Sequence, residues 1–306
     1  MRIIKNTNID FLRKTNITTI FSVLLILAGT ISIIINGGPK LSIDFKGGTL
    51  VAVNYTDTVN IEKIRDELSS ILIDGQSFDF SNAEIKYFGD KSNIAVRIAT
   101  MENEPDQFTK KFTDKMASIF PNSLPENMKN FVLSIEKVGP KVGAELSSDA
   151  LMAILSALFF ILIYVSVRFE FKYAVGAIAA LTHDVLITLG VFSLLGYQVS
   201  LAVIAAFLTI VGYSLNDTIV IFDRVRENVK ISKNANIIST INKSINESLS
   251  RTIITSITTF FVVLILFIFG GEVIHTFSFA MIIGVLIGTY SSIFVASPVV
   301  VYMDSK

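Results

Sequence analysis

Six long apolar segments constrain this chain of 306 residues more than any other feature of its sequence. An α-helix needs about 20 mainly apolar residues to cross the hydrocarbon core of a membrane. Segments close to or above this length cover residues 17–35, 146–167, 173–195, 199–222, 252–269 and 273–302. The sequence therefore predicts an α-helical polytopic membrane protein with six transmembrane helices.

The composition agrees with a membrane protein and excludes several functional classes. Charged residues make up 17% of the chain, against about 25% in soluble proteins. A formal net charge of zero gives no indication of nucleic-acid binding. With no cysteine and two histidines, disulfides, thiol nucleophiles and multi-histidine metal sites are not expected. We also find no nucleotide-binding loop, so we expect no enzyme, no cofactor and no metal.

Lysine and arginine residues predict the orientation of the spans, because they concentrate in cytoplasmic loops. Residues 1–16 hold four of them, residues 168–172 hold two, and residues 223–251 hold six. The turns on the other side, residues 196–198 and 270–272, hold none. We therefore expect both termini in the cytoplasm.

This orientation divides the chain into a membrane part and one external domain. Residues 1–16 form a cytoplasmic tail, and residues 17–35 form an uncleaved first span, because no small-residue cleavage site follows them. Residues 36–145 form a domain outside the cytoplasm. Residues 146–303 hold spans two to six with a cytoplasmic loop at 223–250, and residues 304–306 end in the cytoplasm.

The pattern of residues 36–145 changes to that of a soluble α+β protein. We expect strands at 41–45, 49–55, 83–88, 93–99 and 131–138, and helices at 61–73 and 105–120. The order β-α-β-β-α-β suggests a ferredoxin-like domain. This fold serves many functions, so we interpret the domain only as a binding or mechanical module.

A glycine-containing segment, residues 139–143, joins this domain to the second span. If a helix continues from the domain into the membrane, it would transmit force or orientation between them. The alternative is a plain linker.

Ionisable residues are few within the spans, where they are costly and mark functional sites or internal pairs. His183 and Asp184 lie near the middle of the third span, and Asp217 lies in the cytoplasmic half of the fourth, after Asn216. At 1.5 Å per residue, Asp217 is roughly 8 Å inside the end of its span. Arg251 opens the fifth span on the same side, so it could pair with Asp217.

A protonatable relay is the functional interpretation of these residues. Burial favours a neutral carboxyl group and a neighbouring arginine favours its charged form, so a group between the two effects can load and release a proton. We assign Asp217, Arg251 and Asp184 to this relay, with Asn216, His183 and Thr255 as supporting polar residues.

Structural interpretations of the same residues remain open. Asp217 and Arg251 could form a static buried pair that only fixes helix packing. Arg251 could instead pair with Glu247, one turn earlier at the cytoplasmic surface. His183 and Asp184 could be an internal pair, and for His183 we favour a structural role. A stripe at Ala280, Gly284, Gly288 and Ser292 favours close packing within the bundle.

Eight segments in register across the six spans resemble the SecD/SecF family of the RND superfamily. These segments are residues 44–49, 138–143, 168–170, 182–184, 212–220, 222–228, 251–256 and 269–271. The chain has one set of six spans, so it resembles a single subunit of the family rather than a fused pair.

The resemblance implies a role in protein export across the bacterial inner membrane. Members work as a complex with SecD beside the SecYEG channel, with YajC as a further partner, and use the proton-motive force to complete preprotein export after the SecA ATPase. The family's key acidic residue falls on Asp217, its arginine on Arg251 and another membrane acid on Asp184.

Two alternative functions would fit the same architecture. The chain could be half of an RND-type proton-coupled exporter for small molecules or lipids, although its external domain is small for that. It could also be a structural scaffold of the translocon that transduces no energy.

Overall fold

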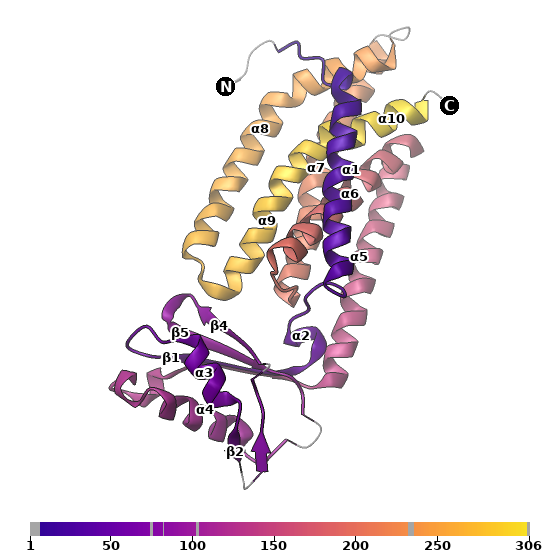
Figure 1. Ribbon diagram of the computed structural model, residues 1–306. Coiled ribbons are helices and arrows are strands. Elements are labelled where there is room, and N and C mark those ends of the chain that lie inside the picture. Colours follow the sequence, from indigo (N-terminus) through magenta and orange to yellow (C-terminus); the bar gives the residue numbers. More distant parts are fainter. Residues whose placement is uncertain (1–6, 74–75, 82, 102–103, 232–235, 305–306) are drawn as a thin grey trace. The chain divides into compact units, whose positions relative to one another are not determined.

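The computed structural model describes residues 7–73, 76–81, 83–101, 104–231 and 236–304 (Figure 1). The chain divides into two compact units, one formed by residues 1–40 and 150–306 and the other by residues 41–149. Arg2, Lys5, Lys233 and Lys306, which contribute to the predicted orientation, lie outside the described residues.

The first unit confirms the six predicted transmembrane helices. Six helical segments are long and apolar enough to span a membrane, at residues 12–35, 140–168, 171–195, 201–231, 237–269 and 274–304. Their helices are α1 (Thr15–Ile35), α5 (Pro140–Arg168), α6 (Phe171–Leu195), α7 (Leu201–Ile231), α8 (Ile237–Phe269), α9 (Gly271–Ser291) and α10 (Ser297–Asp304). A π-helical turn, Ser292–Ala296, joins α9 to α10.

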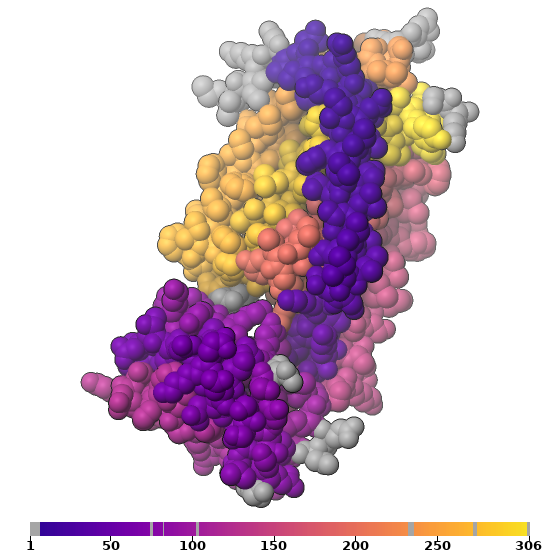
Figure 2. All heavy atoms as spheres, viewed as in Figure 1, coloured from indigo at the N-terminus to yellow at the C-terminus, as the bar shows by residue number. Residues whose placement is uncertain are grey.

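Helices α6, α7 and α9 form the centre of the bundle, and each buries about half of its apolar segment. Helices α1, α5 and α8 expose most of theirs, as expected for helices that face lipid or a partner. Figure 2 shows α1 along the surface of the bundle.

Glycines let the central helices approach closely. A Cβ atom at Gly284 of α9 would clash with the Ile210 side chain of α7, and one at Gly288 would lie 3.0 Å from Ser214. The predicted small-residue stripe of the last span therefore packs inside the bundle, against α7. A larger side chain at Gly284 would displace the Ile210 side chain, and one at Gly288 would press on Ser214.

Helix α1 is held on α6 by small and polar residues. Gly29 meets Gly190, where an added Cβ atom would lie 2.6 Å from the Gly190 Cα atom. One turn further toward the C-terminal end of α1, the hydroxyl groups of Ser32 and Ser193 lie 2.9 Å apart. The backbones of the two helices therefore lie unusually close together over this stretch.

The serine pair offers a direct test of this packing. Because the natural chain has no cysteine, a double variant Ser32→Cys, Ser193→Cys carries one possible intramolecular disulfide. We expect it to form under mild oxidation, since the neighbouring backbones are close enough for disulfide geometry. A reduction-sensitive shift in gel mobility measures it, and each single-cysteine variant is the control. Absence of the shift in the double variant would contradict the α1–α6 contact.

The second unit is a ferredoxin-like α+β domain, as predicted. Its elements are β1 (Gly48–Asn54), α3 (Ile61–Leu68), β4 (Glu84–Phe88), β5 (Asp90–Ile98), α4 (Phe108–Ile119) and β6 (Val132–Val138). The four strands lie in the order β4-β5-β1-β6, and every neighbouring pair is antiparallel. An additional hairpin, β2 (Ile71–Ile73) with β3 (Gln76–Phe78), follows α3.

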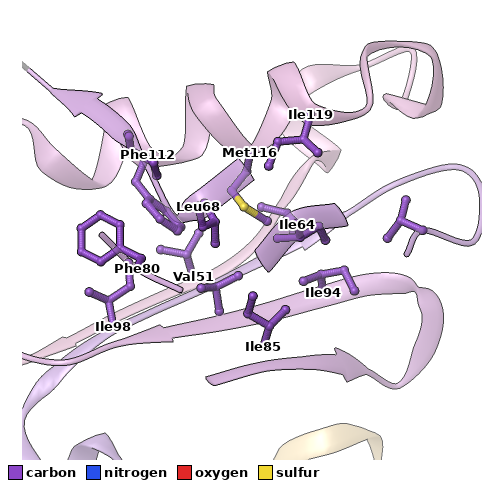
Figure 3. Close-up of a cluster of buried hydrophobic side chains, with 14 of the residues drawn as sticks. Val51, Ile64, Leu68, Phe80, Ile85, Ile94, Ile98, Phe112, Met116 and Ile119 are labelled. Atoms are coloured by element: carbon purple, nitrogen blue, oxygen red, sulfur yellow. The ribbon is translucent and has the colours of Figure 1, made fainter. Parts of the chain in front are cut away.

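The core of this domain lies between the sheet and its two helices (Figure 3). Val51 and Ile94 of the sheet and Ile64, Phe112 and Met116 of the helices are fully buried. The hydroxyl group of Tyr55 donates to the Met116 carbonyl oxygen at 2.7 Å, and burial raises the pKa of this phenol. The alternation of apolar residues in the sequence thus gives a single core.

Two predicted elements of this domain are wrong. Residues 41–45 were expected as a strand, but Ile43–Lys46 forms a short helix, α2. The Ser42 side chain accepts a hydrogen bond from the Asp44 backbone N–H at 3.2 Å, which is the geometry of a helix N-cap. Gly47, with φ of 74°, ends this turn.

The predicted helix over residues 61–73 is also too long, because α3 ends at Leu68. Ser69 closes it by donating its hydroxyl group to the Asp66 carbonyl oxygen at 2.6 Å. Residues 71–73 then pair with 76–78, with Ile71 and Ile73 buried and Leu72 exposed. The apolar residues 71 and 72 fit the helical spacing of the predicted helix, but they belong to a strand.

The glycine-containing segment before the second span is helical. Helix α5 begins at Pro140, a favourable first position for a helix, and continues to Arg168. An added Cβ atom at Gly143 would lie 2.8 Å from the Phe45 carbonyl oxygen, so α2 packs directly on the first turns of α5. This stretch is thus a helix rather than a plain linker.

Candidate functional site

Asp217 lies in the interior of the bundle, on the face of α7 that meets α8. Its side chain is 2% exposed, and it faces Thr255 and Ser256 of α8. The helical period places it there, since Ser214 and Ile221, three or four residues away, are also buried. One carboxylate oxygen, Oδ2, has no hydrogen-bond partner. The group is therefore enclosed by protein but incompletely bonded.

Arg251 lies close to this carboxyl group without holding it in a salt bridge. Its charge acts on Asp217 from the next helix, yet the described part of the chain holds no ion pair between the two. The Arg251 side chain is exposed. The structure thus brings the two predicted relay residues near each other, but not in the static buried pair considered from the sequence.

Glu247 is engaged elsewhere. Its carboxylate accepts hydrogen bonds from Arg224 at 2.6 Å and from Asn228 at 2.8 Å. Lys243 lies 4.0 Å from the same carboxylate. These contacts satisfy the Glu247 carboxylate and leave Arg251 outside the cluster.

Two predicted supporting residues differ in their placement. The Thr255 hydroxyl group lies beside Asp217 and donates to its own helix, at 3.0 Å from the Arg251 carbonyl oxygen. Asn216 is exposed and points away from the interior of the bundle. Thr255 therefore belongs to the candidate site, and Asn216 lies on the outer surface of α7.

Asp184 forms a separate cluster that is fully buried and fully bonded. One oxygen contacts His183 Nδ1 at 2.9 Å. The other accepts hydrogen bonds from Ser214 of α7 at 2.6 Å and from Ser291 of α9 at 2.8 Å. The side chain is 0% exposed. Asp184 thus joins three central helices through direct contacts.

His183 extends this cluster to the first span. Its Nε2 atom lies 2.9 Å from the Ser22 hydroxyl group, which in turn lies 3.0 Å from the Tyr290 hydroxyl group. Tyr290 donates to the Thr18 carbonyl oxygen at 2.7 Å, and its ring stacks on His183. The ring thus links α1 to the rest of the bundle, and a structural role for His183 stays a prediction.

The two clusters lie on neighbouring faces of α7. Ser214 points to Asp184 on α6, whereas Asp217, three residues later, points to α8. Helix α9 also contributes to both, with Ser291 at Asp184 and Thr289 at Ser256. A displacement of α7 or α9 would therefore alter both clusters together.

Sequence reasoning missed the hydroxyl groups that complete both clusters. They belong to Ser22, Tyr213, Ser214, Ser256, Thr289, Tyr290 and Ser291. Serine and threonine occur throughout the six spans, and in helices they commonly bond their own backbone, so spacing alone does not distinguish them. Only the packing of the helices identifies the ones that meet.

Comparison with known proteins places this arrangement in a family. The family described as "Protein export membrane protein SecD/SecF, C-terminal" matches residues 121–306. The protein translocase subunit SecF of Calditerrivibrio nitroreducens is 45% identical, covering 100% of this chain and 97% of the relative. The protein of the same description from Rhodothermus marinus is 43% identical, covering 100% of this chain and 96% of the relative.

Two solved structures are also similar. The crystal structure of SecDF, a translocon-associated membrane protein from Thermus thermophilus, has a TM-score of 0.84 at 35% identity. It matches 98% of this chain, which corresponds to 39% of that longer chain. A crystal structure of SecDF in a super-membrane-facing form gives a TM-score of 0.68 with the same identity and coverage.

Proposed function

The chain belongs to the SecD/SecF family of protein-export membrane proteins, as a translocase subunit of the SecF type, and from this premise we propose that a proton gradient drives its part in export. Together with SecD, it promotes late stages of preprotein translocation. The structural match to SecDF supports the partnership with SecD. In this proposal the chain itself catalyses no chemical reaction and needs no cofactor, and the energy source is the gradient.

The observation that carries this proposal is the buried, incompletely bonded carboxyl group of Asp217 beside Arg251. An unpaired charge is costly inside a membrane protein, and the cost changes when a proton is gained or lost. Because the described residues leave Arg251 outside any ion pair with Asp217, the two groups are free to move together or apart. Proton binding at Asp217 would then change the packing of α7 against α8.

The exposed polar residues beside the site support a partner on this face. Arg251 and Asn216 are exposed in the single chain, and Thr258 lies two turns beyond Arg251 on the exposed side of α8. Charged and amide groups at membrane depth rarely face lipid. We propose that SecD covers this face and completes the site.

The wider assembly and the location follow as further parts of the proposal. SecYEG, YajC and SecA are the expected neighbours, and an unfolded preprotein is the expected substrate on the outer side. The protein is a multi-pass membrane protein, and we propose the bacterial inner membrane with both termini in the cytoplasm. The concentration of lysine and arginine in one set of loops supports this orientation.

Replacement of Arg251 tests the proposal. We expect Arg251→Gln to lower gradient-dependent export about tenfold or more. The positive charge of Arg251 favours release of the proton from Asp217, and this variant removes that charge. Arg251→Lys should restore part of the activity, since it keeps the charge. Export of a preprotein into inverted membrane vesicles, with and without an uncoupler, measures the effect.

Arg224→Gln is the matched control, because Arg224 is the half-exposed partner of Glu247 and Glu227 at the end of α7. Exposed ion pairs contribute little to stability, so this variant should export nearly as the natural protein does. Equal export by Arg251→Gln and the natural chain, at any gradient, would favour the structural scaffold instead.

A further inference from the structure

Three buried oxygen atoms without a hydrogen-bond partner lie in the described part of α7, α8 and α9. They are Asp217 Oδ2, Thr252 Oγ1 and Ser278 Oγ, whose side chains are 2%, 1% and 0% exposed. Nearly all buried polar groups in proteins are bonded to protein or to ordered water. Three such atoms on three helices that pack against one another therefore indicate a polar seam within an otherwise apolar bundle.

A cluster of hydroxyl groups lies on the same seam. Ser256 of α8 and Thr289 of α9 are 2.6 Å apart, oxygen to oxygen. Tyr213 of α7 donates to Ser256 at 3.2 Å. Ser256 also faces the carboxyl group of Asp217. Each of the three helices thus contributes one hydroxyl group to a connected set that ends at the candidate relay residue.

The polar atoms are spread along the length of the helices rather than gathered at one depth. Thr252 precedes Ser256 by one turn on α8, and Tyr213 precedes Asp217 by one turn on α7. Ser278 precedes Thr289 by 11 residues, which is about three turns and roughly 16 Å on the same face of α9. The seam therefore extends from Asp217 in both directions along the bundle.

We propose that protons reach and leave Asp217 along this seam between α7, α8 and α9. Tyr213, Ser256 and Thr289 act as positioning residues in a hydrogen-bonded relay, and Ser278 and Thr252 bind the water molecules that extend it. At each hydroxyl group one O–H bond forms while another breaks, so only Asp217 gains or loses a proton. This inference rests on the proposed function, because it assigns a route to the same carboxyl group.

The cluster around Asp184 does not offer such a route within the described residues. Both of its carboxylate oxygens are bonded to side chains, and His183 is bonded at both ring nitrogens. A relay must accept and release hydrogen bonds as the proton passes, so unpartnered acceptors favour the α7–α8–α9 seam. Asp184 and His183 instead tie α1, α6, α7 and α9 together.

A structural role for the hydroxyl groups is the competing explanation. Ser256 also donates to the Thr252 carbonyl oxygen at 2.8 Å, and Thr289 donates to the Val285 carbonyl oxygen at 2.7 Å. Such bonds to the helix backbone add little to stability. Variants that keep side-chain shape but remove the hydroxyl group distinguish the two roles.

The experiment uses the full chain with SecD in proteoliposomes, with an imposed pH gradient and a pH-sensitive dye inside. We expect Thr289→Val, which keeps the shape of threonine, to slow proton uptake about tenfold or more. Thr289→Ser should restore it, because the hydroxyl group returns. Ser256→Ala should act as Thr289→Val does, and Tyr213→Phe should have a smaller effect because its bond is longer.

Thr18→Val is the matched control, since Thr18 lies on α1, outside the α7–α8–α9 seam, and its hydroxyl group bonds only its own backbone among the described residues. It should conduct as the natural chain does, and thermal melting verifies that every variant is folded. If both Thr289→Val and Ser256→Ala took up protons at the rate of the natural chain, the proposed route would be wrong. If Asp217→Asn alone abolished uptake in that case, the proposed function would stand; unchanged uptake in Asp217→Asn would remove both.

Discussion

Asp217→Asn is expected to abolish the part of preprotein export that depends on the proton gradient, while the chain still folds and binds SecD. Asparagine has nearly the shape of aspartate but cannot take up and release a proton. Because Asp217 Oδ2 has no partner in the described structure, the amide group replaces no existing hydrogen bond at that atom. Export kinetics with and without an uncoupler measure the effect, and the variant should run at the uncoupled rate under both conditions.

Asp223→Asn is the matched control for this variant. Asp223 lies on the same helix and is about half exposed, and its ion-pair contact among the described residues is a long one of 3.8 Å with Arg168. Its replacement should leave the response to the uncoupler unchanged. The motor interpretation would fail if Asp217→Asn kept the full response to the gradient, whatever its absolute rate.

Gly29→Leu is expected to separate α1 from α6 and to destabilise the membrane unit by about 2–3 kcal/mol. An added Cβ atom already lies 2.6 Å from the backbone of Gly190, so the helices must move apart. The movement would break the bonds of Ser22 to His183 and of Ser32 to Ser193. Thermal melting of the purified chain in detergent measures the loss.

Gly212→Leu provides the comparison, because Gly212 is also in a membrane helix but, beyond its own helix backbone, no atom of the described residues lies within 4 Å of an added Cβ. Leucine is a better helix former than glycine by about 1 kcal/mol, so this variant should be as stable as the natural chain or more stable. Equal melting temperatures for the two leucine variants would show that the close α1–α6 approach is not required.

Much of the fold could be predicted from the sequence, because it is set by local patterns. The six spans follow from apolar length, and the order of strands and helices in the ferredoxin-like domain follows from periodicity. The errors arose where short local interactions override a pattern. Ser42 caps a helical turn within 41–45, and Ser69 ends α3 before 71–73. Neither effect is visible in the alternation of apolar residues.

The candidate site could be predicted only in part. Asp217, Arg251 and Asp184 stand out because charges are rare within membrane spans. Whether Asp217 and Arg251 form a relay stays a prediction, and so does a relay role for Asp184, whose bonds to Ser214 and Ser291 favour a structural one. The surrounding hydroxyl groups come from four different helices, so their meeting depends on tertiary packing that no local pattern contains.

The strand order of the ferredoxin-like domain has a consequence for how the chain is made. The central strand β1 is synthesised first, yet its two neighbours, β5 and β6, come from residues 90–98 and 132–138. Pairing over such sequence separations is slow, and β1 keeps an open edge until β6 emerges. Helix α5 begins only two residues after β6 ends, so the sheet can close only when the ribosome is already delivering the second membrane segment. Completion of the domain and insertion of that segment are therefore coupled steps in the biogenesis of this protein.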